Sequence, residues 1–370
     1  MTESGPQTDA IERFAETIQH ACASRNALRF RGGGSKDFYG ERLSGEVLDT
    51  RHFSGIVDYD PSELVVTARG GTPLAALEAA LDDRKQMLAF EPPHFASSAT
   101  STATVGGMVA AGLSGPRRAY AGAVRDFVLG AKVMDARGRV LRFGGQVMKN
   151  VAGYDLSRLM AGSLGTLALI LEVSLKTTPR PVAEVTRRLE MQQEQALQEL
   201  NAWSASGLPV SASAWSAGEL SVRLSGAVSA VDAACRLIGG EKIEEGSARF
   251  WEAVRDHGHP FFRASRALWR LSLPATAPVA ALAAIPGDVL LEWGGALRWI
   301  LTDSGAPVIR EAAAKAGGHA TLFRGGSEEQ RRVSGVFHPL APPLLKIHKN
   351  LKAVFDPQGI FNPGRMYPDF

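Results

Sequence analysis

Apolar and polar positions along the first 180 residues predict an N-terminal helix followed by short strands. Apolar residues recur at helical spacing over Thr8–Ser24. A second apolar stripe follows Thr72 and Pro73, so we expect Thr72 to cap a helix and Pro73 to take its first position. The predicted strands of this half are Leu28–Arg31, Leu64–Ala68, Val128–Met134, Arg139–Phe143 and Leu167–Leu175.

The pattern changes after Pro179-Arg180-Pro181, because two prolines in three residues interrupt any regular element. Beyond this point a strand, a helix and a hairpin follow one another twice. We interpret this order as a duplicated βαββ unit that forms an antiparallel sheet with helices on one face, which makes the fold class α+β. The strands are Val182–Leu189, Val210–Trp215, Leu220–Leu224, Ala267–Leu273, Val289–Trp293 and Ala296–Leu301, and the helices are Gln192–Ala205, Ala227–Ile238 and Ala277–Ile285.

A last helix is predicted close to the C-terminus. Leu344, Ile347, Leu351 and Val354 form one apolar stripe, which we expect to be buried. On the opposite side, we expect three lysines to lie in water: Lys346, Lys349 and Lys352. The chain therefore divides into three expected parts, residues 1–180, 181–335 and 336–370.

Composition and charge exclude several classes of protein. The 370 residues carry 41 Lys and Arg against 38 Asp and Glu, and this small excess gives no support to nucleic-acid binding. The two cysteines, Cys22 and Cys235, are too few for a disulfide framework, a CxxC motif or an all-cysteine iron–sulfur cluster. Glycines and Glu172 interrupt the most apolar stretch, Leu159–Leu175, so no membrane span is predicted. We expect a cytoplasmic protein.

The chain has 39 glycines, and several clusters of them lie in the first half. The segment 31–35, RGGGS, follows a predicted strand and can offer free backbone N–H groups to an anion such as a pyrophosphate, or it can be a simple turn. The segment 97–112 is rich in small hydroxyl residues and glycine, which suits either a cofactor lying against the backbone or a low-complexity loop. The segment 31–35 has the spacing of neither a Rossmann nor a Walker motif.

Taken in order, these segments resemble a known family. RGGGS, EPP, ATVGGMVA, RDFVLG, KNVAGYDL, GSLGTL and FDPQGIFNPGR are similar to the FAD-binding domain of the vanillyl-alcohol oxidase/p-cresol methylhydroxylase (PCMH) family, over residues 28–180 and 344–366. The middle region, with Leu268–Leu273 and Trp293–Trp299, most resembles the FAD-binding subunits of glycolate oxidase, also called glycolate dehydrogenase. The resemblance implies a two-part PCMH-type FAD-binding domain over 1–180, a smaller cap domain over 181–335, and a segment 336–370 that returns to the FAD-binding domain.

The resemblance also implies where FAD binds. One loop, Arg31, Gly32, Gly33, Gly34 and Ser35, and a second around Thr102, Thr104, Gly106 and Gly107 would hold its pyrophosphate. The walls of the site would come from Ser98, Gly165, Thr166 and Ile170, and Asn362 would approach the isoalloxazine ring. Because Ser35 stands where many relatives carry a linking histidine, we expect FAD to be noncovalent.

The function implied is that of an FAD-carrying subunit in a complex that oxidises glycolate or a related 2-hydroxy acid. Two cysteines cannot hold clusters, so we expect an iron–sulfur subunit to accept the electrons, and the complex can bring this chain to the inner face of the membrane. The metal-binding histidine stretch of hydroxy-acid dehydrogenases is missing, so we expect no metal here and expect a homologous FAD-binding catalytic subunit to oxidise the substrate. Two alternatives remain open, a self-sufficient FAD-dependent dehydrogenase of another alcohol and a flavin-binding assembly subunit without turnover.

The catalytic residue is left unassigned. His94, His338 and His348 qualify as a base by residue type alone. The close pair His257 and His259 lies at a predicted helix end, and we expect it on the surface.

Overall fold

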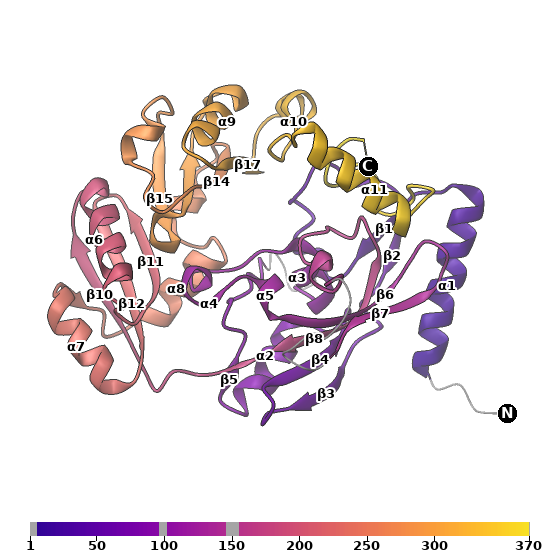
Figure 1. Cartoon of the computed structure of the whole chain (residues 1–370), viewed down its shortest axis with the longest axis horizontal. Helices are drawn as coiled ribbons and strands as arrows, with labels where there is room; N and C mark the ends of the chain where they lie inside the picture. The colour runs from indigo at the N-terminus through magenta and orange to yellow at the C-terminus, as the bar shows by residue number, and fades with distance from the viewer. Residues whose placement is uncertain (1–5, 96–101, 146–154, 370) are drawn as a thin grey trace.

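The computed structural model describes residues 6–95, 102–145 and 155–369 (Figure 1). Its strands form a five-stranded sheet, an eight-stranded sheet and two small two-stranded sheets. In Figure 1 the eight-stranded sheet lies to the left, in pink and orange, and the five-stranded sheet lies lower, in purple. The yellow C-terminal segment returns to the strands nearest the N-terminus. The α+β class is confirmed.

The five-stranded sheet is antiparallel and is covered on both faces. Its order is β3(Ile56–Asp60), β4(Val65–Arg69), β8(Leu169–Lys176), β6(Val128–Met134) and β7(Val140–Gly144). One face of the sheet packs against two helices, α2(Leu74–Asp82) and α3(Val105–Ala111). Their shared core contains Leu77, Met108 and Val173. The other face packs with α1(Pro6–Ser24) through Phe14 and Ile18. Short elements complete this part: β5(Gln86–Met87), α4(Arg118–Ala121), α5(Val124–Phe127), a 3₁₀ turn at Arg158–Met160, and β9(Thr178–Pro179).

Helix α2, the helix predicted to follow Thr72, starts one residue later than the sequence predicted. Helix α2 begins at Leu74, and Pro73 occupies the capping position without a side-chain hydrogen bond. The Thr72 hydroxyl instead accepts a hydrogen bond from Gly55 N–H at 2.9 Å. Thr72 therefore ties α2 to a neighbouring loop.

The eight-stranded sheet contains the predicted duplication. Strand order is β13-β10-β12-β11-β15-β16-β14-β17. Each half is a strand, a helical segment, a hairpin, a helix and a final strand, and the halves join edge to edge through β11 and β15. The strands are β10(Ala183–Glu190), β11(Val210–Ser216), β12(Glu219–Gly226), β13(Glu241–Lys242), β14(Leu268–Ser272), β15(Asp288–Glu292), β16(Leu297–Leu301) and β17(His319–Arg324).

Helices cover both faces of this sheet, so the expectation of a single covered face is wrong. One face packs with α6(Gln193–Ala205), α7(Val228–Ile238) and α9(Ala306–Lys315). On the other, α8(Ser247–Arg255) contacts Ala212 and Ala214 through Trp251. The helix predicted over Ala277–Ile285 is only a 3₁₀ turn at Val279–Leu282, and two more short 3₁₀ turns lie at Pro260–Arg263 and Trp293–Gly295.

The C-terminal segment contains α10(Glu328–Ser334) and α11(Pro342–Phe355), and the expected orientation of α11 is wrong. The apolar stripe faces outward, because Leu344, Ile347 and Val354 are 50%, 53% and 68% exposed. Lys352 is only 5% exposed, since its Nζ donates to Thr166 O at 2.8 Å, Phe361 O at 2.7 Å and Asp356 Oδ2 at 2.6 Å. An ammonium with three acceptors is stable inside the protein, and it determines which side of α11 is buried.

The residues after α11 complete the sheet begun at the N-terminus. Strand β1(Leu28–Arg31) pairs in parallel with β2(Glu46–Asp49). On its other side, Leu28 N–H donates to Ile360 O at 2.7 Å and Asn362 N–H donates to Leu28 O at 2.8 Å. The two ends of the chain therefore form one structural unit. Among the described residues, no helix is long and apolar enough to cross a membrane.

Candidate functional site

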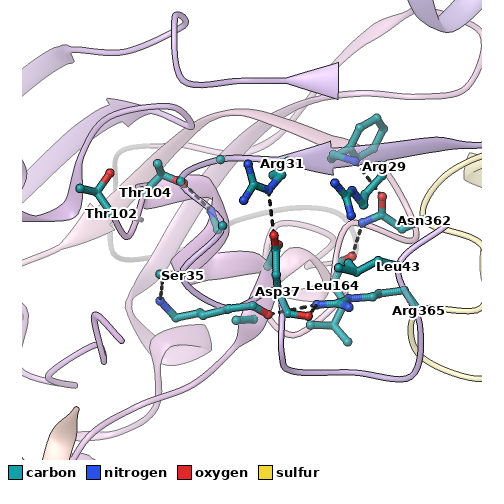
Figure 2. A pocket seen from close by; sticks show the side chains of 18 residues that line it. Arg29, Arg31, Ser35, Asp37, Leu43, Thr102, Thr104, Leu164, Asn362 and Arg365 are labelled. Carbon is teal, nitrogen blue, oxygen red and sulfur yellow. Dashed lines mark hydrogen bonds and ion pairs between the residues drawn. The ribbon is translucent and has the colours of Figure 1, made fainter. Parts of the chain in front are cut away.

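Two cavities that share lining residues lie between the glycine-rich loop after β1, helix α3 and the C-terminal tail (Figure 2). Their volumes are about 90 Å³ and 70 Å³. Phe30, Gly107 and Asn362 line both of them. We call this combined space the loop cavity, and it runs from the glycine-rich loop to strand β8.

The glycine-rich loop approaches the start of α3 more closely than any side chain would allow. A Cβ atom on Gly33 would lie 1.6 Å from Thr102 O, and one on Gly32 would lie 2.2 Å from Thr104 Oγ1. The backbone N–H groups of Gly33, Gly34 and Ser35 have no acceptor in the part of the chain that the structure describes. Consecutive unpaired N–H groups at a close approach suit an anion.

Cationic side chains surround the same end of the loop cavity. Arg29, Arg31, Lys36 and Arg365 line it, whereas Asp37 is its single carboxylate among the described lining residues. Arg31 Nε donates to Asp37 Oδ2 at 2.8 Å, a contact drawn as a dashed line in Figure 2. Arg29 Nε is buried without an acceptor in the described structure. The excess positive charge and this unpaired donor fit a ligand with more than one negative charge, such as a pyrophosphate.

Burial changes the acidity of two of these cations. It lowers the pKa of Lys36 to about 8, with the charge of Asp256 acting in the opposite direction. It also lowers the pKa of Arg365 to about 10, against the opposing effect of Asp37. A bound anion would raise both pKa values, because it would stabilise the charged forms.

Asn362 connects the other end of the loop cavity to two distant segments. Its Nδ2 donates to Leu164 O at 2.6 Å, and its Oδ1 accepts from Phe30 N–H at 2.8 Å. Asn362 has φ +41°, in the left-handed region that asparagine tolerates better than most residues. Gly165 leaves room for it, because a Cβ there would lie 2.6 Å from Asn362 Nδ2.

Comparisons with known proteins agree with this geometry. A family model described as "FAD binding domain" matches residues 8–144. The chain is 46% identical to the glycolate oxidase subunit GlcE of Escherichia coli (strain K12) over 363 residues, which cover 98% of this chain and 99% of that protein. The chain belongs to the GlcE family of glycolate oxidase subunits. It carries an FAD-binding domain, so the FAD expected from the sequence is confirmed.

More distant relatives share part of the sequence or the fold of this chain. Glycolate oxidase subunit GlcD of Bacillus subtilis (strain 168) is 34% identical over 142 residues, 38% of this chain and 29% of that protein. The structure of p-cresol methylhydroxylase with substrate bound has a TM-score of 0.69 at 14% identity, with coverage of 97% of this chain and 87% of that one. This second likeness shows the fold, and the resemblance to the PCMH-type family is confirmed.

In the structure, most of the residues that the sequence analysis assigned to FAD binding lie close together. Twelve of them line the loop cavity: Arg31, Gly32, Gly33, Gly34, Ser35, Thr102, Thr104, Gly106, Gly107, Gly165, Ile170 and Asn362. Thr166 does not, because it lies behind the wall with its hydroxyl donating to Ser163 O at 2.7 Å. Ser98 lies outside the described residues.

Sequence reasoning missed three cations of the loop cavity in this GlcE-family chain. Arg29 alternates with Arg31 along β1, so the two project from the same face of the strand, and this period of two was a usable signal. Lys36 directly follows the RGGGS segment, and Arg365 ends the NPGR tail.

None of the three histidines named as possible bases lines the loop cavity. His94 Nε2 lies 2.8 Å from Glu78 Oε2, and His338 Nδ1 accepts from Ala320 N–H at 3.4 Å. His348 lies beside Tyr367, with ring centroids 6.4 Å apart. Within the described residues, no group of three His, Cys, Asp or Glu side chains could hold a metal ion. His257 is buried, so the prediction that it lies on the surface is wrong.

Proposed function

We propose that this GlcE relative is the FAD-carrying subunit of a glycolate-oxidising complex and that its flavin passes electrons to an iron–sulfur subunit. The observation that carries the proposal is the loop cavity, whose unpaired N–H groups and surplus cations suit the pyrophosphate of FAD. When bound, FAD supplies two-electron chemistry, and the protein contributes position and charge.

Specific residues would hold the cofactor. The N–H groups of Gly33, Gly34 and Ser35, with Arg29 and Lys36, would bind the pyrophosphate. Asn362 and the Gly165–Ile170 wall would lie at the flavin end. Ser35 has a hydroxyl where covalent relatives carry a linking group, so we infer noncovalent attachment. In this arrangement residues 1–180 form the FAD-binding domain, 181–335 the cap domain, and 336–370 the segment that closes the cavity.

Substrate oxidation is assigned to a homologous FAD-binding subunit. The partial match to GlcD is the basis, because two different subunits that carry the name glycolate oxidase share sequence over the FAD-binding region. The histidine-flanked metal stretch of hydroxy-acid dehydrogenases is missing from this sequence. The homologous subunit therefore oxidises glycolate or a related 2-hydroxy acid, and the electrons released reach this chain's flavin within the complex.

Two measurements on the purified chain test the proposal. Acid precipitation should release all FAD into the supernatant, and flavin retained by the pellet would contradict noncovalent attachment. After anaerobic mixing of the FAD-loaded chain with excess glycolate, the flavin absorbance near 450 nm should stay almost unchanged over a period on the order of seconds. Bleaching should become fast after the homologous flavin subunit is added, whereas rapid bleaching by the chain alone would refute the relay role.

A further inference from the structure

Helix α11 presents an apolar surface to solvent. Leu344, Ile347 and Val354 are all exposed and recur at helical spacing, and we call this surface the α11 stripe. No other described helix carries as many large exposed apolar side chains. A contiguous apolar surface exposed to water is unfavourable, and it marks a site of interaction.

The charged residues of α11 all have one sign. The helix contains Lys346, Lys349 and Lys352 and no Asp or Glu. Lys352 is turned inward, whereas Lys346 and Lys349 are exposed. Lys349 has a surface partner, Asp369, at 3.3 Å. The exposed side of α11 therefore combines apolar surface with positive charge, and it is complementary to an apolar surface rimmed by carboxylates.

The buried side of α11 connects the stripe with the loop cavity. Lys352 Nζ donates to Thr166 O at 2.8 Å and to Phe361 O at 2.7 Å. These acceptors adjoin Gly165 and Asn362, which line the loop cavity at the end where we place the flavin. In Figure 1, α11 lies at the edge of the molecule beside β1. A helix with its side chains is about 10–12 Å thick, so a partner on the stripe lies about one helix diameter from the flavin end.

We propose that the α11 stripe is the docking surface for the electron-accepting iron–sulfur subunit, which meets it with an apolar centre and an acidic rim. The inference rests on the proposed function, which supplies the need for such a subunit, and it adds the surface of this chain that receives it. Electron transfer is fast only over short distances, so the acceptor has to bind close to the flavin. The α11 stripe meets this requirement, whereas the exposed apolar residues of α7 lie on the opposite side of the molecule (Figure 1).

Two other occupants fit the α11 stripe less well. In a symmetric contact between two copies of this chain, the stripe would meet itself and bring Lys346 and Lys349 of both copies together, which is repulsive. An anionic membrane surface attracts clusters of about four to eight Lys or Arg. Helix α11 offers only two exposed lysines. The apolar stripe with a small positive charge therefore favours a protein partner that carries carboxylates.

The test uses the assembled complex, purified through an N-terminal tag on this chain from the organism that makes it. Iron, acid-labile sulfide and FAD are measured in the size-exclusion peak that contains the tagged chain. Ile347→Asp places a carboxylate at the centre of the stripe, so the iron per FAD should fall at least about tenfold while the FAD per chain stays unchanged. The matched control is Val228→Asp on α7, because Val228 and Ile347 are both 53% exposed, and it should retain the iron of the wild type.

Charge reversal tests the acidic rim. Lys346→Glu should lower the iron per FAD by about two- to fivefold at low salt. Lys315→Glu makes the same change in net charge on the exposed side of α9, and it should retain the iron of the wild type. If Ile347→Asp loses FAD or unfolds at a lower urea concentration than the wild type, the comparison of Lys346→Glu with Lys315→Glu decides alone.

The outcomes separate this inference from the proposed function. Iron retained equally by Ile347→Asp and Val228→Asp would refute the docking surface and leave the proposed function standing. A wild-type complex without iron would refute the proposed function, and this inference with it. Light scattering and flotation with phosphatidylglycerol vesicles test the FAD-loaded chain alone. A dimer that Ile347→Asp converts to a monomer, or vesicle binding that it abolishes, would overturn the assignment of the stripe to the iron–sulfur subunit.

Discussion

Replacement of Lys352 by methionine should destabilise the protein far more than an ordinary surface substitution. Methionine retains the apolar stem and removes the ammonium, which donates to Thr166 O, Phe361 O and Asp356 Oδ2. Asp356 is then left as a buried charge with only backbone N–H partners. Removal of one partner of a buried ion pair costs about 3–5 kcal/mol. That is a large part of the total stability of a typical domain, about 5–15 kcal/mol.

Urea unfolding followed by circular dichroism, with and without saturating FAD, measures this loss. The control is Lys349→Met, one turn away on α11, whose partner Asp369 lies 3.3 Å away at the surface. It should cost less than about 1 kcal/mol. Because Thr166 and Phe361 adjoin Gly165 and Asn362, Lys352→Met should also weaken FAD binding. Equal stabilities for the two variants would show that the buried ammonium does not hold the C-terminal segment in place.

Three further substitutions test other parts of the structure. Gly33→Ala should abolish FAD binding measured by flavin fluorescence, since its Cβ would meet Thr102 O at 1.6 Å, whereas Gly258→Ala, with 3.6 Å to its nearest atom, should retain FAD. Asn362→Ala should lower the free energy of unfolding by about 2 kcal/mol or more, because Phe30 N–H and Leu164 O both lose their partner; an unchanged urea midpoint would contradict this role. The folded pKa of Glu292, about 7, exceeds its ordinary value of 4.5, so its contribution to stability is complete below pH 4.5 and is lost as the pH rises through 7. Between pH 5 and pH 8 the stability of the wild-type chain relative to Glu292→Gln should therefore fall by about 3 kcal/mol in urea unfolding, and parallel pH profiles would refute this.

Elements bounded by strong turn signals could be predicted from the sequence to the residue. Strand β1 ends where three glycines begin, and β6 ends at the Asp135 turn, and both have the predicted bounds. The side of α11 that is buried could not be predicted in this way. Helical periodicity identifies an apolar stripe, but it does not show which side of the helix packs against the rest of the protein. The acceptors for Lys352 come from segments that are brought together only in the folded chain.

The same distinction applies to the candidate sites. The glycine-rich loop carries its chemistry in consecutive residues, so a local pattern was enough to find it. His257 was misjudged because its environment is assembled from Phe95, Trp299 and Phe323, which are distant in sequence. The sequence around His257 and His259 contains no local pattern that indicates the burial of His257.

The joining of the two chain ends has a consequence for how the protein is made. Phe30 N–H bonds the side chain of Asn362, 332 residues later. At about 5–20 residues per second, ribosomes need roughly 15–65 s to synthesise the intervening chain. During that time β1 lacks the partner that Ile360 provides, and the loop cavity lacks the wall formed by Asn362 and Arg365. Completion of the cavity, and with it the loading of a cofactor, can therefore come only after the segment that contains Asn362 and Arg365 has been synthesised.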